Sequence, residues 1–432
     1  MLKKPKIVIV GAGSAIFGLS MLKDAFSTKE LWGSELVLVD IDKAAVEKVT
    51  VAANRINDQL KAGYKISSTT DRLEALPGAD FVIVSIAVDR MKMWKKDFSV
   101  PQKHGVPHVL GENVGPGAVF HTMRNLPIIL DICKDIEKYC PEALLINFTN
   151  PESRLCMAIK KYTNVKVVGL CHQINAGIDI VSTLTHTDRK YIDVKAWGIN
   201  HFTWMVDIRD KRTGEDLYPA LIEKEKTYDS SYEKLSRFIF RHYGLFPTSG
   251  DDHLGEFFPY AHEMISKEGY DFGKYEQRRQ DVVKILEGII NKDVAIDSNL
   301  IKPSGEKAFN IINGITNNTN ELLESINLPN EGYITNLPDD AIVEVPSIVS
   351  GNGVNGLALG KLPRGIAALC KTQIDVQHLV VDAGVNGDRN LVVQALLTDP
   401  NVPSADAAMN IYHELMEVNK PYLRQFSYDS YD

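Results

Sequence analysis

Cysteine and histidine side chains follow two apolar segments of this chain, at the points where the segments end. Cys171 comes directly after the mostly apolar run 165–170, and His201 closes the motif Gly198-Ile-Asn-His201. A thiolate and an imidazole at strand ends form a mixed sulfur and nitrogen ligand set for a divalent metal ion. Taken singly, each residue would more often be a small buried hydrophobe or a hydrogen-bonded core histidine. The pair is therefore a candidate metal site, and other segments of the sequence must show whether a site is expected there.

A glycine-rich turn near the N-terminus predicts a dinucleotide-binding loop. Gly11-Ala-Gly13-Ser14 follows a predicted buried strand at 6–10 and precedes a predicted helix at about 17–26. Gly11 permits a tight turn, Gly13 lets the backbone approach a pyrophosphate, and the helix N-terminus then faces the phosphate charge. Ile16 stands where the full fingerprint has a third glycine, so the loop alone could also be a turn that binds nothing.

Asp40 strengthens the cofactor prediction and indicates which cofactor is used. It ends the next predicted strand, where a carboxylate can accept hydrogen bonds from a ribose diol. The 2′-phosphate of NADP would meet this negative charge, so we expect NAD. The predicted cofactor-binding residues of the loop, the helix start and the second strand are Gly11, Gly13, Ser14, Ala15, Phe17 and Asp40.

Three further polar segments are expected near the same edge of the sheet. Glu112-Asn-Val-Gly-Pro-Gly117 is a polar, glycine-rich loop, and Asn147 with Asn150-Pro151 ends another predicted strand. Ligands bind where the carboxyl ends of parallel strands meet, so these segments could converge on a nicotinamide. Pro247 to His253 carries two acids and an imidazole. That loop is either a solvated turn or a general base presented over a sugar-sized pocket.

The alternation of strands and helices predicts the fold class. Right-handed βαβ units are indicated by predicted strands at 6–10, 36–40, 66–69, 81–86, 144–147 and 165–170, with helices such as 44–60 between them. We predict an α/β protein with a Rossmann-type doubly wound sheet over 1–195 and an α+β domain over 196–432, as in lactate and malate dehydrogenases. In the second part we expect strands at 197–208 and 341–349, helices at 275–290 and 367–384, loops around a short strand over 317–338, and a frayed tail at 427–432.

Composition excludes several classes of function. The formal net charge of -8 and the pI near 5.8 argue against a nucleic-acid or anionic-membrane partner. No long apolar span is present, and the apolar run 7–10 is too short for a signal peptide. Five cysteines without regular spacing do not suggest a disulfide framework, so we expect a cytoplasmic protein.

The chain as a whole resembles family 4 of the glycoside hydrolases, the NAD- and manganese-dependent glycosidases. The most specific feature is the Cys-His pair followed by Asn-His in this order. The similar motifs are Gly11-Ala-Gly-Ser14, Gly115-Pro-Gly117, Asn150-Pro151, Gly169-Leu-Cys-His172, Gly198-Ile-Asn-His201, Gly250-Asp251, Ser304-Gly-Glu306, Val343-Glu-Val-Pro346 and Ala395-Leu-Leu-Thr-Asp-Pro400.

The resemblance implies a redox-assisted elimination, because NAD-dependent members are exceptions to two-carboxylate hydrolysis. Hydride passes from C3 of the sugar to NAD, a base removes the acidified C2 proton, and the C1–oxygen bond breaks. Water then adds and the hydride returns, so NAD is not consumed. A metal ion on the sugar O2 and O3 would polarise the C3 carbonyl as a Lewis acid.

The resemblance also implies roles for individual residues. Cys171 and His201 would hold Mn2+, and Asp251 would be the C2 base at a position where phospho-sugar members have tyrosine, with Asp252 the second candidate. His172 stands where phospho-sugar members tend to have asparagine, which points to an unphosphorylated α-hexoside or α-hexuronide. Asn150 would bridge sugar and cofactor, and the predicted substrate contacts are Asn150, His172, Asn200, Glu112 and Arg124.

Two segments bear on the sugar. Cys171-His-Gln-Ile174 matches none of the usual tetrads, although Gln173 is closest in shape to the glutamate of α-galacturonidases. The stretch 250–258 also looks most like the galacturonidase type, with Asp252 replacing a common arginine. The loss of that positive charge leaves a slight preference for α-galacturonides, with α-galactosides and α-glucosides as alternatives.

Two other classes of function stay open on the sequence. A 2-hydroxy acid dehydrogenase shares the fold but gives the Cys171/His201 pair no role, and it would accumulate NADH. An NAD-binding sensor without catalysis is disfavoured by the joint presence of Cys171, His201 and Asp251. The expected partner is a small glycoside, without nucleic acid or membrane, and the resemblance implies a homodimer or homotetramer.

Overall fold

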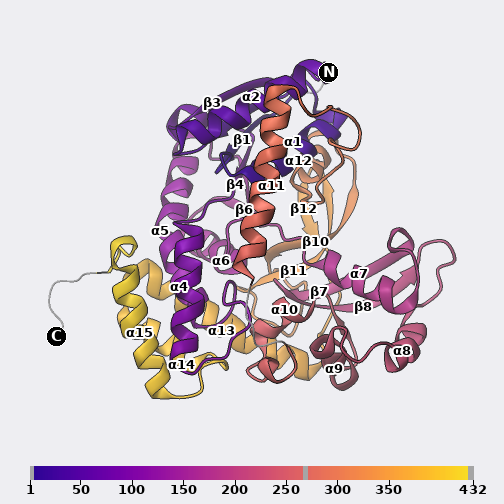
Figure 1. Ribbon diagram of the computed structural model, residues 1–432, viewed down its shortest axis with the longest axis vertical. Helices are drawn as coiled ribbons and strands as arrows, with labels where there is room; N and C mark the ends of the chain where they lie inside the picture. The colour runs from indigo at the N-terminus through magenta and orange to yellow at the C-terminus, as the bar shows by residue number, and fades with distance from the viewer. Residues whose placement is uncertain (1–3, 266–270, 427–432) are drawn as a thin grey trace.

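The computed structural model describes residues 4–265 and 271–426 (Figure 1). The strands are β1 (Lys6–Val10), β2 (Glu35–Val39), β3 (Lys65–Thr69), β4 (Phe81–Val84), β5 (Leu144–Asn147), β6 (Lys166–Gly169), β7 (Ile192–Ile199), β8 (Phe202–Asp210), β9 (Phe246–Pro247), β10 (Glu321–Pro329), β11 (Ile342–Ser350) and β12 (Gly353–Gly356). They form one 12-stranded sheet in the order β3-β2-β1-β4-β5-β6-β10-β11-β7-β8-β9, with β12 paired to β11.

The first half of the sheet confirms the predicted doubly wound fold. All pairs from β3 to β6 are parallel, and β1, β2 and β4 are almost wholly buried runs of aliphatic residues. Such runs suit strands that are covered on both faces. From β10 onward the pairs are antiparallel, so the second half extends the same sheet.

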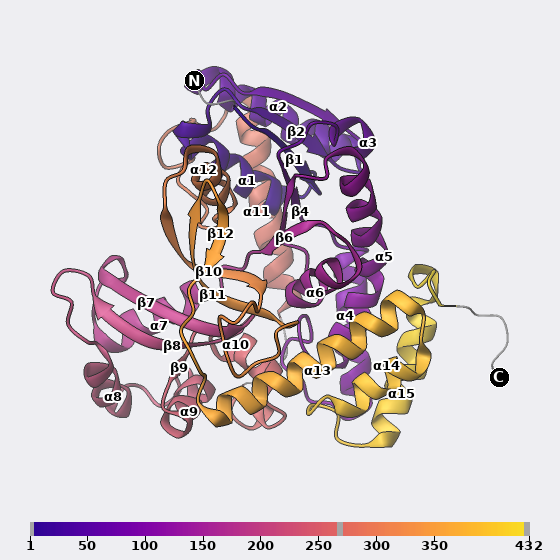
Figure 2. The ribbon, with the colours of Figure 1, turned by 180° about the vertical axis from the view of Figure 1, so that it is seen from behind.

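Helices pack around this sheet. They are α1 (Ala15–Ser27), α2 (Lys43–Leu60), α3 (Arg72–Ala75), α4 (Arg90–Lys103), α5 (Pro116–Tyr139), α6 (Glu152–Tyr162), α7 (Ile174–Thr185), α8 (Tyr218–Thr227), α9 (Lys234–Tyr243), α10 (Asp251–Leu254), α11 (Phe272–Asn291), α12 (Ala308–Asn317), α13 (Arg364–Asn386), α14 (Arg389–Thr398) and α15 (Ala405–Asn419). α11 packs on α1 and α2, whereas α13 to α15 pack around α4, α5 and α6 (Figures 1 and 2).

Two of the expected elements differ from the structure. The segment 197–208 is not one strand but part of the β7–β8 hairpin, whose turn is Asn200-His201. His201 has a φ of 62°, an unusual backbone for a residue other than glycine, and no Gly or Pro marks this turn. Within 317–338, β10 is a nine-residue strand between β6 and β11. Pairing on both sides here overrides the poor strand propensity of its asparagine and proline. The expected frayed tail lies outside the described residues.

One row of register partners crosses the sheet from β2 to β8 and explains how the site is assembled. The partners in this row are Val39, Val10, Val84, Asn147, Gly169, Asn327, Glu344, Gly198 and Thr203. Asp40 and Gly11 follow the row directly, and Cys171 and His201 follow it within three residues. The sheet register therefore brings the predicted cofactor and metal residues to one edge.

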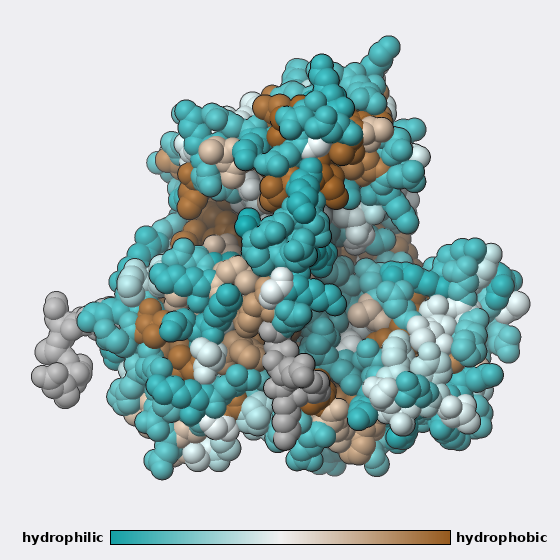
Figure 3. All heavy atoms as spheres, in the orientation of Figure 1, coloured by the Kyte–Doolittle hydropathy of each residue, from teal (hydrophilic) through white to brown (hydrophobic). Residues whose placement is uncertain are grey.

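Three apolar clusters hold these layers together. The largest surrounds the sheet, a second lies between α4, α5 and the helices α13 to α15, and a third joins α7 and α8 to β7 and β8. On the face drawn in Figure 3, hydrophilic residues predominate and hydrophobic ones gather mainly in the upper half. Across the described ranges, no helix combines the length and the apolar character that crossing a membrane requires.

Candidate active site

The structure brings Cys171 and His201 into contact. The Sγ atom of Cys171, just past the end of β6, lies 3.0 Å from Nε2 of His201 in the β7–β8 turn. Two such ligands around one tetrahedral ion would lie roughly 3.6 Å apart, given bond lengths of about 2.3 and 2.1 Å. A small opening of this contact would let both atoms bind one metal ion, so the pair fits the predicted site.

The surroundings of the two ligands set their protonation. Burial, with help from His253 and His172, lowers the pKa of His201 well below its ordinary value, so the imidazole is neutral and can offer a lone pair. Burial and the carboxyl group of Glu344 raise the pKa of the Cys171 thiol. A bound cation reverses that effect, because a coordinating thiol is deprotonated outright.

Asn113 contacts the other nitrogen of His201. Its Nδ2 lies 3.4 Å from Nδ1 of His201, while its own Oδ1 is buried without a hydrogen-bond partner. The two ends of an amide have the same shape, and turning the amide gives Nδ1–H an acceptor. In that arrangement His201 keeps its proton on Nδ1 and directs the lone pair of Nε2 toward Cys171, which is the tautomer a metal requires.

Glu344 on β11 holds the turn that carries His201. It accepts hydrogen bonds from Nδ2 of Asn200 (3.2 Å), from the backbone N–H of His201 and from the hydroxyl of Ser325. Burial raises the pKa of Glu344 to about 7. The Asn200 side chain also bonds the Cys171 thiol, so its visible contacts are with the metal ligands and their support. The sequence predicted Asn200 as a sugar contact, and it marked Glu344 only as part of the motif 343–346, without a role.

The glycine loop has the close approaches that a dinucleotide site needs. Gly11 has a φ of 91°, and a Cβ there would lie 1.9 Å from the carbonyl oxygen of Ser85. The backbone N–H of Gly13 donates to Oδ2 of Asp40 over 2.8 Å. Ser14 caps α1 by accepting from the N–H of Phe17, Ala15 begins that helix, and the ring of Phe17 lies 5.3 Å from that of Phe148.

Two residues complete this loop although the sequence did not single them out. A Cβ on Gly18 would lie 2.5 Å from the carbonyl oxygen of Ala12. Gly18 therefore allows the close helix–strand packing that the fingerprint assigns to its third glycine, two positions after Ile16. Ile41 follows Asp40 directly and is a 95% exposed apolar side chain beside the predicted ribose contact.

Glu112 enters the site through an ion pair. Its Oε1 accepts from Arg90 (2.6 Å) and from Nδ2 of Asn150 (3.3 Å). Burial opposes ionisation of Glu112, but Arg90, together with His121 and His253, lowers its pKa. The guanidinium of Arg90 also lies 5.0 Å from the ring of Trp94 and 5.6 Å from that of Tyr275. Glu112 and Asn150 lie together, as the sequence predicted. Arg90 is a further residue at this place, which the sequence did not indicate.

Glu256 lies behind the same loop. Its Oε1 accepts from the backbone N–H groups of Glu112, Asn113 and Val114 at 2.8, 3.0 and 3.3 Å. Its Oε2 lies 3.7 Å from Nδ1 of His253, whose ring meets the His201 ring edge-on at 4.5 Å between centroids. His201, His253 and Glu256 each bring one possible ligand atom within 4.8 Å of the others. Glu256 was not singled out from the sequence, although a spacing of three residues from His253 could have indicated the pair.

His172 follows the candidate metal ligand Cys171 in the chain, but its side chain lies at the protein surface. Its side chain is 61% exposed, and Nδ1 lies 3.2 Å from Oε2 of Glu306, which raises the pKa of His172. Ser304 on the same loop donates its N–H and its hydroxyl to the buried Asp24 of α1 at 2.6 and 2.5 Å. The contact of His172 with a sugar stays a prediction.

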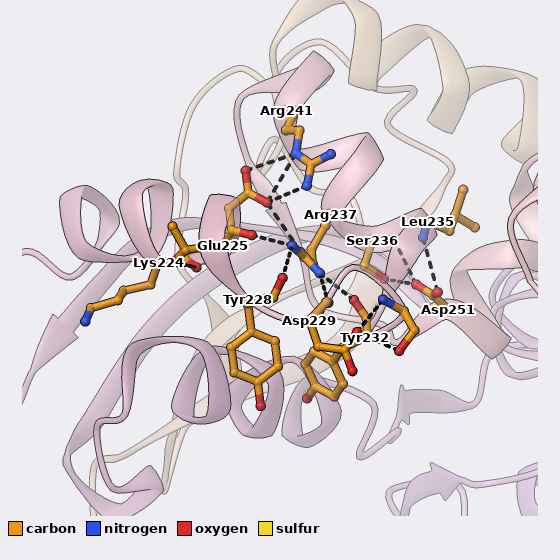
Figure 4. A network of polar contacts seen from close by, with 12 residues as sticks. Lys224, Glu225, Tyr228, Asp229, Tyr232, Leu235, Ser236, Arg237, Arg241 and Asp251 are labelled. Carbon is orange, nitrogen blue, oxygen red and sulfur yellow. Dashed lines mark hydrogen bonds and ion pairs between the residues drawn. The ribbon is translucent and has the colours of Figure 1, made fainter.

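The carboxylate of Asp251 accepts hydrogen bonds from the first turn of α9 (Figure 4). Oδ1 accepts from the N–H and the hydroxyl of Ser236, both at 2.8 Å, and Oδ2 accepts from the N–H of Leu235 at 3.1 Å. The Asp251 carboxyl group is also hydrogen-bonded to the side chain of Glu233, and burial together with Asp251 raises the pKa of Glu233 to about 7. Asp252 is exposed, and its Oδ1 accepts from the N–H of His253.

The visible contacts of Arg124 are with other helices, and its predicted contact with the sugar stays a prediction. Its side chain is 2% exposed and donates from both terminal nitrogens to Asp97 and from Nη1 to Asn419 over 2.6 Å. This buried ion pair holds α5 against α4 and the end of α15. In the sequence nothing distinguished such a structural arginine from one that binds substrate.

Comparisons with known proteins give one consistent result. Residues 6–186 match the model described as family 4 glycosyl hydrolase, and residues 196–402 match the model described as family 4 glycosyl hydrolase C-terminal domain. The chain is 33% identical to an α-glucosidase from Erwinia rhapontici, over 97% of this chain and 98% of the relative. It is 31% identical to an α-galactosidase (94% of each chain) and 30% identical to an α-galacturonidase (92% and 93%), both from Bacillus subtilis strain 168.

Solved structures show the same fold. A Bacillus subtilis structure described as glucosidase lplD superposes with a TM-score of 0.86 at 28% identity, over 95% of this chain and 99% of that one. A 6-phospho-α-glucosidase from gut microorganisms, in complex with NAD and Mn2+, has a TM-score of 0.84 at 22% identity, over 98% and 100%. A lactate dehydrogenase from a deep-sea metagenome library follows at 0.52 and 16%, over 89% and 99%.

Proposed function

The chain belongs to family 4 of the glycosyl hydrolases, and on this basis we propose that it uses NAD and Mn2+ to cleave unphosphorylated α-hexosides or α-hexuronides. The proposal is carried by the contact between Cys171 Sγ and His201 Nε2, 3.0 Å apart. This pair lies on the sheet edge that also carries the Gly11 loop and Asp40. A soft-ligand pair beside a dinucleotide loop has no role in a hydroxy acid dehydrogenase of the same fold.

The residues present suit both groups. Asp40 and the Gly11 loop would hold NAD, and Cys171 and His201 would hold the metal ion. When bound, these groups supply the hydride acceptor for C3 and the Lewis acid for the oxygens on C2 and C3. The chain orients the reacting sugar between them through Asn150 and Glu112, which already bond each other over 3.3 Å.

A base must then take the proton from C2, and we propose Asp251 for this role, with Asp252 as the second candidate. The carboxyl groups of Asp251 and Glu233 are hydrogen-bonded to each other, so the proton would be taken up by this pair. Hydrogen bonds from Leu235 and Ser236 anchor Asp251 to α9. Fixed geometry is what a general base needs in order to act at one carbon atom.

The sugar itself is proposed from the sequence of 250–258, which favours α-galacturonides over α-galactosides and α-glucosides. One cation in the structure supports this order. Arg278 on α11 is exposed, and its charge weakly opposes the larger effect of Glu306, which raises the pKa of His172; we propose Arg278 as the partner of a sugar carboxylate. Arg90, in contrast, already forms an ion pair with Glu112.

A panel of nitrophenyl α-galacturonide, α-galactoside and α-glucoside, with NAD, Mn2+ and a thiol reductant, tests the function. We expect nitrophenol release from at least one substrate, dependent on both NAD and Mn2+, without accumulation of NADH. Accumulation of NADH with a hydroxy acid, and no release of nitrophenol, would instead identify a dehydrogenase. NAD binding with no turnover of any glycoside would identify a sensor.

A further inference from the structure

Glu256 is a buried carboxylate at the junction of three parts of the site. A single oxygen, Oε1, collects the backbone N–H groups of Glu112, Asn113 and Val114. Successive N–H groups that converge in this way form an anion-binding nest, and here the anion is a side chain of the protein itself. The conformation of the loop therefore depends on Glu256.

The same loop continues into α5 and is held from a second side. The carboxyl group of Asp399, which follows α14, accepts from the backbone N–H of Gly115. Asn401 donates from Nδ2 to the backbone oxygen of Glu256 over 2.8 Å, and to Oδ1 of Asp399 over 3.0 Å. These contacts tie Glu256 and the loop to the segment that follows α14.

Two routes lead from Glu256 to the metal ligand His201. Through the loop, Glu256 places Asn113, whose amide faces Nδ1 of His201. Through Oε2, it lies 3.7 Å from Nδ1 of His253, whose ring packs edge-on against His201. The loop also presents Glu112 to Asn150.

We propose that Glu256 is a positioning residue that sets the orientation and tautomer of His201 for metal binding and holds Glu112 in place. The inference rests on the proposed function, because it gives His201 the role of a metal ligand. Glu256 acts here through the Asn113 loop and His253, and not as a ligand itself. Partners in this position typically change metal affinity about 10- to 100-fold when they are removed.

Mn2+ titration followed by electron paramagnetic resonance tests the proposal on the full-length protein. Glu256→Gln keeps a carbonyl oxygen for the three N–H groups, so we expect its Mn2+ affinity to stay within about threefold of the wild type. Glu256→Ala removes the acceptor, and we expect about 10- to 100-fold weaker Mn2+ binding with NAD affinity nearly unchanged. If Glu256→Ala does not fold, Glu256→Asp, which withdraws the oxygens by one methylene, should show an intermediate loss.

The matched control is Glu225→Ala, which removes another buried carboxylate, paired with Arg237 and Arg241. It should lower the melting temperature without changing Mn2+ affinity. Wild-type Mn2+ affinity in Glu256→Ala would overturn the proposal. Equal losses in Glu256→Gln and Glu256→Ala would also overturn it, because a direct ligand behaves in that way. A wild-type protein that binds Mn2+ but hydrolyses no glycoside would overturn the proposed function alone.

Discussion

Neighbouring side chains set the protonation of the two candidate metal ligands, Cys171 and His201. Burial keeps His201 neutral, Asn113 faces its Nδ1, and Glu344 holds its backbone. The sequence could point to Cys171 and His201, because each ends an apolar segment. It placed Asn113 in the polar loop 112–117 and Glu344 in the motif 343–346, but it could not predict their contacts with His201, which join segments far apart in the chain.

Asp251 gives the first test at the residue scale. Asp251→Asn should slow exchange of the C2 proton with solvent deuterium by about 100-fold or more, the usual contribution of a general base. It should also weaken the cap of α9, by about 1 kcal/mol. Ser236→Ala is the control, since it removes one hydrogen bond to Asp251 but no base. If exchange is unchanged in Asp251→Asn and lost in Asp252→Asn, the base role moves to Asp252.

The buried carboxyl group of Glu152 should make the free energy of unfolding depend on pH. It is buried over Gly169, where a Cβ would lie 1.3 Å from its Oε1, and it accepts from the Cys156 thiol over 2.9 Å. Burial raises its pKa from 4.5 to about 8. The folded state then binds a proton that the unfolded state has lost, so stability falls as pH rises from about 4.5 to about 8.

Urea unfolding at several pH values measures this effect. Each pH unit within that window costs up to about 1.4 kcal/mol of unfolding free energy. Glu152→Gln carries no titrating proton, so its unfolding free energy should fall less steeply with pH. An unchanged slope would contradict the assignment. Glu142→Gln, on the surface beside Lys166, should leave the slope as it is.

Among the elements, the parallel strands and their helices follow the predicted ranges closely, because buried aliphatic runs and glycine turns are local signals. The β7–β8 hairpin and β10 were predicted only in part, as a strand at 197–208 and a short strand within 317–338. Asn200-His201 turns without glycine or proline, and β10 is stabilised by neighbours on both sides. The buried contacts of Arg124 were also not predictable, because its partners, Asp97 and Asn419, come from two other helices.

Packing of α1 on the sheet can be tested at Gly18. A Cβ there would lie 2.5 Å from the carbonyl oxygen of Ala12, so Gly18→Ala must displace the start of α1. We expect a loss of about 1–3 kcal/mol in stability, as for other overpacked sites, together with weaker NAD binding by calorimetry. Gly365→Ala in α13, where the nearest atom lies 3.3 Å from the added Cβ, should leave NAD affinity unchanged. Unaltered NAD binding in Gly18→Ala would contradict this role.

α11 links the two halves of the molecule and gives the prediction for the sugar. It packs on α1 and α2 and places Tyr275 against Arg90 and Arg278 near His172. If Arg278 meets a uronate, Arg278→Ala should raise the KM for nitrophenyl α-galacturonide about fivefold, because an exposed charge interaction is worth up to about 1 kcal/mol. The KM for the α-galactoside should not change, and Arg279→Ala, whose partner is Glu276, should affect neither. Equal effects on both substrates would rule out carboxylate recognition.

At the scale of the whole molecule, one continuous sheet runs through the two domains that were predicted from the sequence, 1–195 and 196–432. β10 and β11 stand between β6, which leads to Cys171, and β7, which leads to His201. The metal pair therefore exists only when both halves of the sheet are formed. The sequence could indicate each half from its local pattern, but the order of the strands across the junction depends on long-range pairing.

The central claim is that Cys171 and His201 bind a catalytic metal ion beside NAD. The most direct measurement is nitrophenol release by Cys171→Ser under saturating NAD and Mn2+, with NAD affinity measured on the same preparation. Loss of a thiolate ligand should abolish Mn2+-dependent hydrolysis, while NAD binding stays nearly intact because Gly11, Gly13 and Asp40 are untouched. An active Cys171→Ser enzyme whose activity does not depend on Mn2+ would contradict the account.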